Sequence, residues 1–312
     1  MTNLRWGHLT DDAVRQWAEL TNLLARVDGT DEFYDAADLA EELTEAGVTP
    51  AVDTWAVWDG DVMVAFGQLR VGYTTQADGA VRLQCDGGVH PDWRGRGIGR
   101  ELMTLMEARA RGLNAERNPG VPGVFRAAGG LEGSSARRLL RARGYEEARY
   151  FTTMERQLAE APADGDRSAF TSPRPEDEEA VRVAHNTAFA DHWGSSPKTA
   201  EAWHDYYTGR PARPQYSSIL RGADGGVSTY VLVSQYLDDE LFVDLVGTVP
   251  AARGAGLAAA ALARTIELCR GAAGIKVLGL DVDSESPTGA TRLYERLGFI
   301  AKHTTATMTR PA

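Results

Sequence analysis

Two glycine-rich segments of this 312-residue chain have the residue types and the spacing of an anion-binding turn. Each follows a strand-like apolar run and leads into an Ala/Leu-rich run with helical spacing. The first N–H groups of a helix are unpaired and carry positive potential, and glycines let a phosphate approach the backbone closely. Such a turn suits a pyrophosphate. The two segments are Arg94, Gly95, Arg96, Gly97, Ile98 and Gly99, and Arg253, Gly254, Ala255, Gly256, Leu257 and Ala258.

The spacing distinguishes these segments from other phosphate-binding loops. A dinucleotide-binding fingerprint has the pattern G-x-G-x-x-G, whereas the pattern here is Arg-x-x-Gly-x-Gly/Ala. No Lys-Ser/Thr pair follows the glycines, which argues against nucleotide hydrolysis. A turn that only caps a helix is the alternative, but two copies favour a binding role. Arg94 and Arg253 either add positive charge to the anion site or brace the loop.

The glycine segments belong to a longer repeat. When Arg94 is matched to Arg253, Pro91 and Pro250 also coincide, and ARRLLRARGY at 136–145 resembles ATRLYERLGF at 290–299. A period this long indicates duplicated domains rather than a solenoid. We predict an N-terminal domain at 1–157, a linker rich in Ala, Asp, Pro and Gly at 158–168, and a C-terminal domain at 169–312.

The predicted elements follow a similar order in both domains. Strands that lead through a helix to another strand imply parallel neighbours at the sheet centre, so the predicted class is α/β, with two tandem domains that each have a mixed central sheet flanked by helices. In the first domain we predict helices at 11–27, 35–46 and 97–112 and strands at 54–58, 62–71 and 81–89. In the second we predict helices at 176–191, 199–207, 256–270 and 289–297 and strands at 217–220, 227–235, 241–248, 275–282 and 304–309.

The composition limits the class of protein. Apolar residues make up 43% of the chain and charged residues 25%, which is typical of folded domains. The net charge of -11 disfavours nucleic acid and anionic membranes as partners and tolerates cationic amines. With two cysteines, no signal-like start and no run of roughly 20 apolar residues, we expect a cytoplasmic protein. The histidines at 185, 192 and 204 lack the close spacing of a zinc site, so we predict no metal.

The glycine segments, together with LYERLGF at 293–299, resemble the GCN5-related N-acetyltransferase (GNAT) superfamily. The likeness covers nearly the full chain as two domains, and the tandem form is loosely similar to the actinobacterial mycothiol synthases. The resemblance implies acetyl-CoA as the donor, direct transfer to an amine, and a glycine loop that binds the pyrophosphate. It also implies that the backbone of the preceding strand binds the pantetheine arm. The strand residues concerned are Val89 in the first domain and Val246, Gly247 and Thr248 in the second.

Transfer to an amine needs a base for the amine, support for the thioester oxygen and an acid for the departing thiolate. Tyr294 matches the acid of the family, whereas the first domain has Leu140 there, so the resemblance implies catalysis in the second domain. Phe242 occupies the usual slot of the base. Asp244 and Glu240 lie two residues to either side and share its face of a regular strand. Asp244 is our candidate base, directly or through a water, and Glu240 is second; a solvated or substrate-binding acid is the alternative.

In the family the first two helices and their loop cover the acceptor. That region of the second domain contains His192, Trp193, Trp203 and Tyr206, which suit an amine with an apolar or sugar-like body, although packing alone is the alternative. We therefore expect a small-molecule amine as acceptor. A non-catalytic module that binds or senses acyl-CoA and a peptide or protein N-acetyltransferase stay open. A monomer whose tandem domains imitate a dimer is compatible with the repeat.

Overall fold

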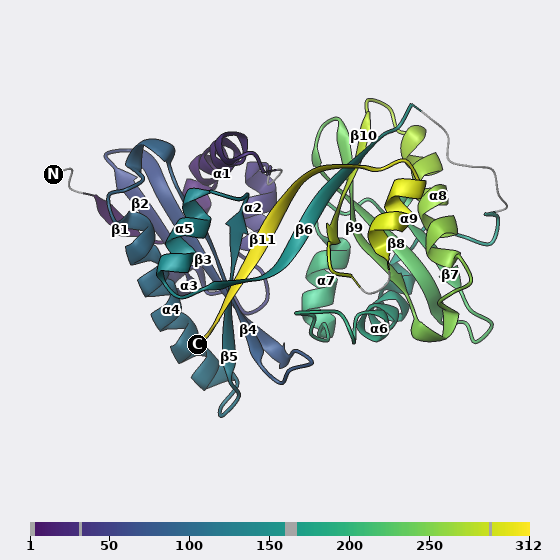
Figure 1. Cartoon of the computed structure of the whole chain (residues 1–312), viewed down its shortest axis with the longest axis horizontal. Helices are drawn as coiled ribbons and strands as arrows, with labels where there is room; N and C mark the ends of the chain where they lie inside the picture. The colour runs from purple at the N-terminus through teal and green to yellow at the C-terminus, as the bar shows by residue number, and fades with distance from the viewer. Residues whose placement is uncertain (1–3, 31–32, 160–166, 287–288) are drawn as a thin grey trace. The chain divides into compact units, whose positions relative to one another are not determined.

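The computed structural model describes residues 4–30, 33–159, 167–286 and 289–312 (Figure 1). It divides into two compact units, Met1–Tyr150 with Thr304–Ala312, and Phe151–His303. Most of the predicted linker lies outside the described residues. Within the described ranges, no helix combines the length and the apolar character needed to cross a bilayer. No three His, Cys, Asp or Glu side chains of these ranges are grouped to hold a metal ion.

The first unit is a mixed sheet with helices on its faces. Its strands lie in the order β1, β2, β3, β4, β5, β11, and only β4 and β5 run parallel. The strands are β1 (Arg5–Gly7), β2 (Thr54–Asp59), β3 (Val62–Thr75), β4 (Val81–Val89), β5 (Gly123–Gly130) and the end of β11 (Ile300–Pro311). The helices are α1 (Val14–Asp28), α2 (Ala36–Glu42), α3 (Pro50–Asp53), α4 (Ile98–Arg117) and α5 (Ser135–Ala142).

The second unit repeats this arrangement. Its strands lie in the order β6, β10, β9, β8, β7, and β9 and β10 form its parallel pair. The strands are the end of β6 (Glu146–Gln157), β7 (Ser218–Arg221), β8 (Val227–Leu237), β9 (Glu240–Thr248) and β10 (Val277–Asp283). The helices are α6 (Glu178–Ala188), α7 (Ala200–Thr208), α8 (Leu257–Arg270) and α9 (Ala290–Arg296). The predicted class, two tandem α/β domains, is confirmed.

The ends of two strands are exchanged between the units. From Phe151 onward β6 pairs with β10 of the second unit, and the end of β11 pairs with β5 of the first. The predicted division assigned 1–157 and 169–312 to separate domains, whereas residues 151–157 and 304–312 each complete the sheet of the other half of the chain. A single boundary along the sequence cannot represent units that are built from discontinuous segments.

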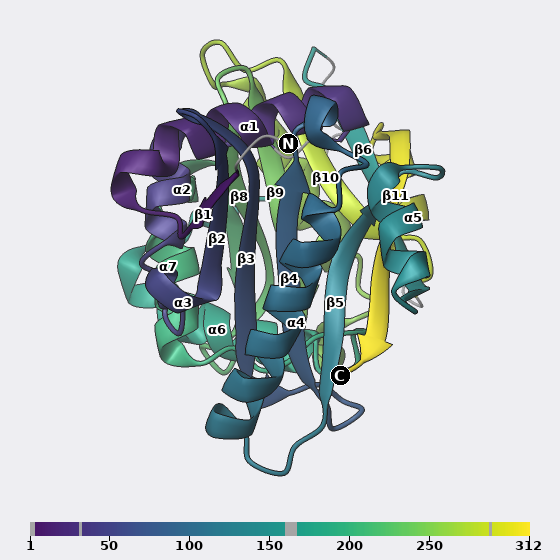
Figure 2. The same ribbon diagram turned by 90° about the vertical axis from the view of Figure 1, so that its left-hand side faces the viewer.

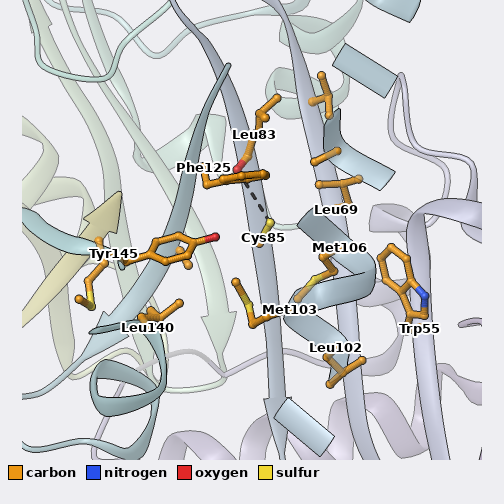
Figure 3. Packing of buried hydrophobic residues seen from close by; sticks show 14 of the residues in the cluster. Trp55, Leu69, Leu83, Cys85, Leu102, Met103, Met106, Phe125, Leu140 and Tyr145 are labelled. Atoms are coloured by element: carbon orange, nitrogen blue, oxygen red, sulfur yellow. Dashed lines mark hydrogen bonds between the residues drawn. The ribbon is translucent and has the colours of Figure 1, made fainter. Parts of the chain in front are cut away.

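Each sheet is covered on both faces. Successive side chains of a strand point to opposite faces, so Ala65 packs in the α4 layer and Phe66 in the α1 layer. Figure 2 shows α4 crossing the face of β3 and β4, and Figure 3 shows Met103 and Met106 of this helix packed near Cys85. In the second unit α8 and α9 cover one face and α6 and α7 the other. Four apolar layers therefore hold the two parallel strand pairs in place.

Both parallel pairs have the same register. In the first unit four residue pairs are formed, from Val81↔Gly123 to Gln84↔Arg126, and in the second four pairs run from Glu240↔Val277 to Val243↔Leu280. Beyond these pairs the parallel strands are no longer paired. The first strand of each pair then runs into a glycine loop, so the same geometry precedes both loops.

Candidate active site

The glycine loops connect β4 to α4 and β9 to α8. Gly95 and Gly97 have φ of 76° and 88°, and Gly254 and Gly256 have φ of 82° and 74°. Residues with a Cβ avoid this left-handed region, although a Cβ at any of the four would have no other atom within 4 Å. Glycine is therefore required by the backbone angle and not by lack of space. The two loops present the open N-termini of long helices in the same conformation.

Arg94 braces the loop of the first unit. Its Nε donates to the carbonyl of Val89 at 3.0 Å, and its Nη1 and Nη2 donate to the Asp28 carboxylate at 2.7 and 2.6 Å. Arg253 makes equivalent bonds, at 3.3 Å to the carbonyl that ends β9 and at 2.9 Å to the carbonyl that ends α6. Each guanidinium thus ties the loop to the end of the preceding strand and of the unit's first long helix. Of the two roles left open by the sequence, the geometry favours bracing.

Asp244 lies in β9 directly after its last parallel pair with β10, where the register of β8 and β9 shifts. Its Oδ2 accepts hydrogen bonds from the hydroxyls of Ser234 and, at 3.3 Å, Tyr206. Burial raises the pKa of Asp244 to about 7, and the two hydrogen bonds oppose this shift only in part. The structure thus brings together the candidate base and one candidate acceptor residue. Glu240 lies at the start of β9, with its carboxylate beside Gly279 of β10.

Tyr294 lies on α9 within the core of the second unit. Its side chain is 7% exposed, and its ring packs edge-on against Phe299 with centroids 5.9 Å apart. Burial raises the pKa of Tyr294 to about 12, so the phenol stays protonated at neutral pH. Among the described residues its hydroxyl has no hydrogen-bond partner. A protonated phenol is therefore held in place by the apolar packing of its ring.

The predicted acceptor residues fall into two groups. Tyr206 on α7 contacts Asp244, while Trp203 on the same helix is 1% exposed and donates its indole N–H to a carbonyl of α6 at 3.2 Å. His192 and Trp193 lie half-buried in the turn after α6, where His192 Nδ1 is 3.1 Å from the Trp193 carbonyl. Trp203 is thus buried by packing, whereas Tyr206 contacts the candidate base Asp244.

Two further side chains of this layer could not be identified from the sequence. His185 Nδ1 lies 2.8 Å from the Tyr230 hydroxyl, and burial lowers the pKa of His185 to about 4, so the imidazole is neutral. The Tyr230 ring occupies the space beside Gly247, where a Cβ would lie 2.4 Å from ring carbons. Gly247, a predicted pantetheine-binding residue, is therefore the residue type that allows this strand to pass Tyr230.

The first unit contains a cavity of about 560 Å³ next to its glycine loop. Its lining includes Arg94, Gly97 and Arg100 of the loop and helix start, together with Trp17 of α1 and Gln68 of β3. Leu140, the counterpart of Tyr294, also lines it and cannot donate a proton. The unit without the candidate acid thus still has space for a ligand.

Comparison with known proteins shows the family of the chain. The acetyltransferase (GNAT) family matches residues 12–121 and 179–299. A mycothiol acetyltransferase of Thermobispora bispora is 29% identical over 267 residues, 78% of each chain, and one of Thermomonospora curvata is 31% identical over 220 residues, 68% of each.

Solved structures match the fold over the whole chain. A GCN5-related N-acetyltransferase of Sphaerobacter thermophilus has a TM-score of 0.76 at 23% identity, covering 99% of this chain and 95% of its own. A tandem GNAT protein of the clavulanic acid biosynthesis pathway has a TM-score of 0.73 at 19% identity, covering 99% and 98%. With one family region in each half, the chain belongs to the acetyltransferase (GNAT) family, in its tandem form.

Proposed function

We propose that this protein acetylates a primary amine of a small molecule with acetyl-CoA, that the second unit carries out the reaction, and that it does so in the cytoplasm. GNAT proteins use acetyl-CoA. The open helix N-termini and left-handed glycines of both loops suit its pyrophosphate. The backbone of β9 from Val246 to Thr248 would bind the pantetheine arm, and Val89 marks the equivalent strand end in the first unit.

The observation that carries the proposal is the environment of Asp244. A carboxylate with a pKa of about 7 is matched to proton transfer near neutral pH, and Asp244 lies where β9 leaves its parallel partner. In the proposed reaction Asp244 accepts a proton from the amine, and the amine nitrogen bonds to the acetyl carbon. The carbon–sulfur bond then breaks, and Tyr294 donates its proton to the departing sulfur. Tyr206 and Ser234 hold the Asp244 carboxylate in position through their hydroxyls.

The first unit is proposed to bind acyl-CoA without turnover. It has a glycine loop of the same conformation and a cavity beside it, but Leu140 replaces the acid. The names of the curated relatives, mycothiol acetyltransferases, support a small-molecule acceptor over a peptide.

Release of free thiol from acetyl-CoA in the presence of candidate amines tests the proposal. The panel consists of aminoglycosides, amino sugars, cysteinyl sugars, polyamines, amino acids and short peptides. Release driven by one class of small amine supports the proposal. Binding of acetyl-CoA without release by any amine would favour a sensing module, and release by peptides alone would favour a peptide acetyltransferase.

Gly256→Ala tests the loop that is assigned to the pyrophosphate. A Cβ at φ 74° costs about 1–2 kcal/mol, and relief of that strain would move the loop, so we expect the KM for acetyl-CoA to rise about tenfold. Gly225→Ala is the matched control, because Gly225 has φ 80°, equally open surroundings and a place in the β7–β8 turn. Equal KM values in the two variants would contradict the assignment.

A further inference from the structure

A row of polar side chains crosses the sheet of the second unit and includes Asp244. Asp281 of β10 directly follows the last parallel pair, Val243↔Leu280, as Asp244 does on β9. Val243 and Leu280 face the α8 layer, so the residues that follow them point to the opposite face, where Asp244 meets Tyr206. Neighbouring strands lie about 4.8 Å apart, and the two carboxylates begin to separate from that spacing. Asp281 is therefore a second carboxylate next to the candidate base.

Two further side chains of the row hold Asp281. Thr153 of β6 is its direct partner in the antiparallel pairing, and the Thr153 hydroxyl donates to Asp281 Oδ1 at 2.7 Å. A hydroxyl has one hydrogen to donate, so the Thr153 oxygen accepts a hydrogen bond at 3.2 Å from Nε2 of His303 on β11. Thr153 is buried, which keeps this connection away from water. The bond from Thr153 stabilises the charged form of Asp281, and His303 orients Thr153.

The first unit has no carboxylate at the corresponding place. Ala128 of β5 pairs with Thr307 of β11 as Asp281 pairs with Thr153. Ala127 lies in the apolar layer of α4, as the residue before Asp281 lies in that of α8, so Ala128 and Asp281 occupy the same face of their sheets. The fold thus keeps the threonine in both units but does not require the acid. The acid occurs in the unit that has the candidate base.

The charge of Asp281 acts on Asp244. Burial is the main cause of the raised pKa of Asp244, the two hydrogen bonds oppose it, and the negative charge of Asp281 adds to it. A negative charge strengthens the affinity of a neighbouring carboxylate for a proton. The other titratable groups here are the phenols of Tyr206 and, near it, Tyr236, and phenols are uncharged near neutral pH. Among the described residues, no cationic side chain contributes to the pKa of Asp244.

We propose that Asp281 is a positioning residue for the reaction of the second unit, in which its negative charge makes the Asp244 carboxylate a stronger base. The inference rests on the proposed function, in which Asp244 accepts the proton of the amine. Thr153 and His303 keep the charge in place beside Asp244. Two acids in unequal surroundings divide the roles in this way, because the buried one takes up the proton while the exposed one, here Asp281, stays charged.

The titration of Asp244 in the full chain tests the role. Carbon-13 NMR of labelled aspartate carboxyls follows Asp244 without turnover, and the loss of its signal in Asp244→Asn assigns it. Asp281→Asn keeps an oxygen that accepts from Thr153 but removes the charge, so we expect the pKa of Asp244 to fall by about one unit. Salt screens the charge of an exposed carboxylate, so raising the ionic strength from about 0.05 to 0.5 M should lower this pKa in the wild type and leave it unchanged in Asp281→Asn.

The same variants are then compared in turnover, with the amine of the panel that releases thiol fastest. The rise of kcat/KM with pH should have its midpoint about one pH unit lower in Asp281→Asn, with a lower plateau at high pH because Asp244 is then a weaker base. Thr153→Val removes the donor to Asp281 and should move the midpoint in the same direction, and Thr153→Ser should restore it.

Two control variants change neighbouring groups of the same face. Glu155 is a carboxylate two residues further along β6 than Thr153, and it forms an ion pair with Lys302. Glu155→Gln should therefore leave the midpoint in place. His303→Gln keeps a donor for Thr153 and cannot titrate, so it should also keep the midpoint.

The outcomes separate this inference from the proposed function. A lower pKa of Asp244 together with a lower kcat/KM midpoint in Asp281→Asn supports the inference. If Ser234→Ala moves the kcat/KM midpoint but Asp281→Asn does not, Asp244 is the base and the inference alone is overturned. If the pKa of Asp244 moves in both variants while the kcat/KM midpoint stays, Asp244 is not the base and both fail. A lower Tm of Asp281→Asn with an unmoved midpoint would show that Asp281 only supports the fold, which also overturns the inference.

Discussion

Tyr294→Phe is expected to lower kcat by about 10²-fold or more, with the KM for acetyl-CoA within about twofold of wild type. Tyr294 is the proposed donor of a proton to the departing thiolate, and that role exists only in the transition state. Its pKa of about 12 keeps the phenol protonated across the working range of pH, so the loss should be independent of pH from about 6 to 9. Steady-state rates of thiol release with a saturating amine give both constants.

The stability of the same variant provides the control. The Tyr294 hydroxyl has no partner among the described residues, so its removal should leave Tm unchanged. Tyr145→Phe is the matched change, because the buried Tyr145 hydroxyl donates to Glu107 at 3.2 Å in the first unit. We expect Tyr145→Phe to lose about 1 kcal/mol of stability and to keep its kcat. Equal loss of kcat in both variants, or full activity of Tyr294→Phe, would contradict the assignment.

The repeated parts of the fold could be predicted because their signals are local. Glycines at positive φ, apolar periodicity and the matched positions of Arg94 and Arg253 all lie within short segments. The sequence offset that aligns these arginines also aligns Val81 with Glu240, and both begin the parallel pairing of their strand. The sequence repeat therefore also predicted which residues begin the parallel pairing in each unit.

The parts that the sequence did not reveal depend on contacts between distant residues. β5 reads GVFRAAGG, with few side chains typical of strands, and it forms because β4 and β11 pair with it on either side. The pairings of β6 with β10 and of β11 with β5 join segments more than 100 residues apart, and no local pattern predicts such an exchange.

In the candidate site, too, some features follow from local sequence and others depend on contacts between distant residues. Asp244 could be proposed from its place on the strand, but its hydrogen bonds come from Ser234 on β8 and Tyr206 on α7. The tryptophans of the acceptor region could not be separated by sequence, because the burial of Trp203 and its hydrogen bond to α6 depend on how the helices pack. Unpaired donors such as Gln68 Nε2 are visible only when every neighbour is placed.

Asp244→Asn is expected to lower kcat/KM for the amine by about 10²–10⁴-fold, because the amide cannot accept the proton. In the wild type, kcat/KM should rise with pH through a midpoint near 7, since the carboxylate form of Asp244 predominates only above its pKa. The Asp244→Asn variant should no longer show this rise of kcat/KM with pH. Glu240→Gln, which also replaces a carboxylate by its amide four residues earlier on β9, is the control. It should keep both the value of kcat/KM and its rise with pH. The reverse pattern would transfer the role of base to Glu240.

The hydrogen bonds from the neighbours of Asp244 determine in which direction its pKa changes when those neighbours are substituted. The Ser234 hydrogen bond lowers the pKa of Asp244, so Ser234→Ala should move the midpoint of the rise of kcat/KM to higher pH. Tyr206→Phe should move it in the same direction. The folded pKa of about 7 lies above the ordinary aspartate value of 3.8, so Asp244 contributes stability at low pH that is lost as pH rises through 7. Asp244→Asn should therefore raise Tm relative to wild type more at pH 8 than at pH 5. If the midpoint of the rise of kcat/KM moved to lower pH in Ser234→Ala, the titrating group would not be Asp244.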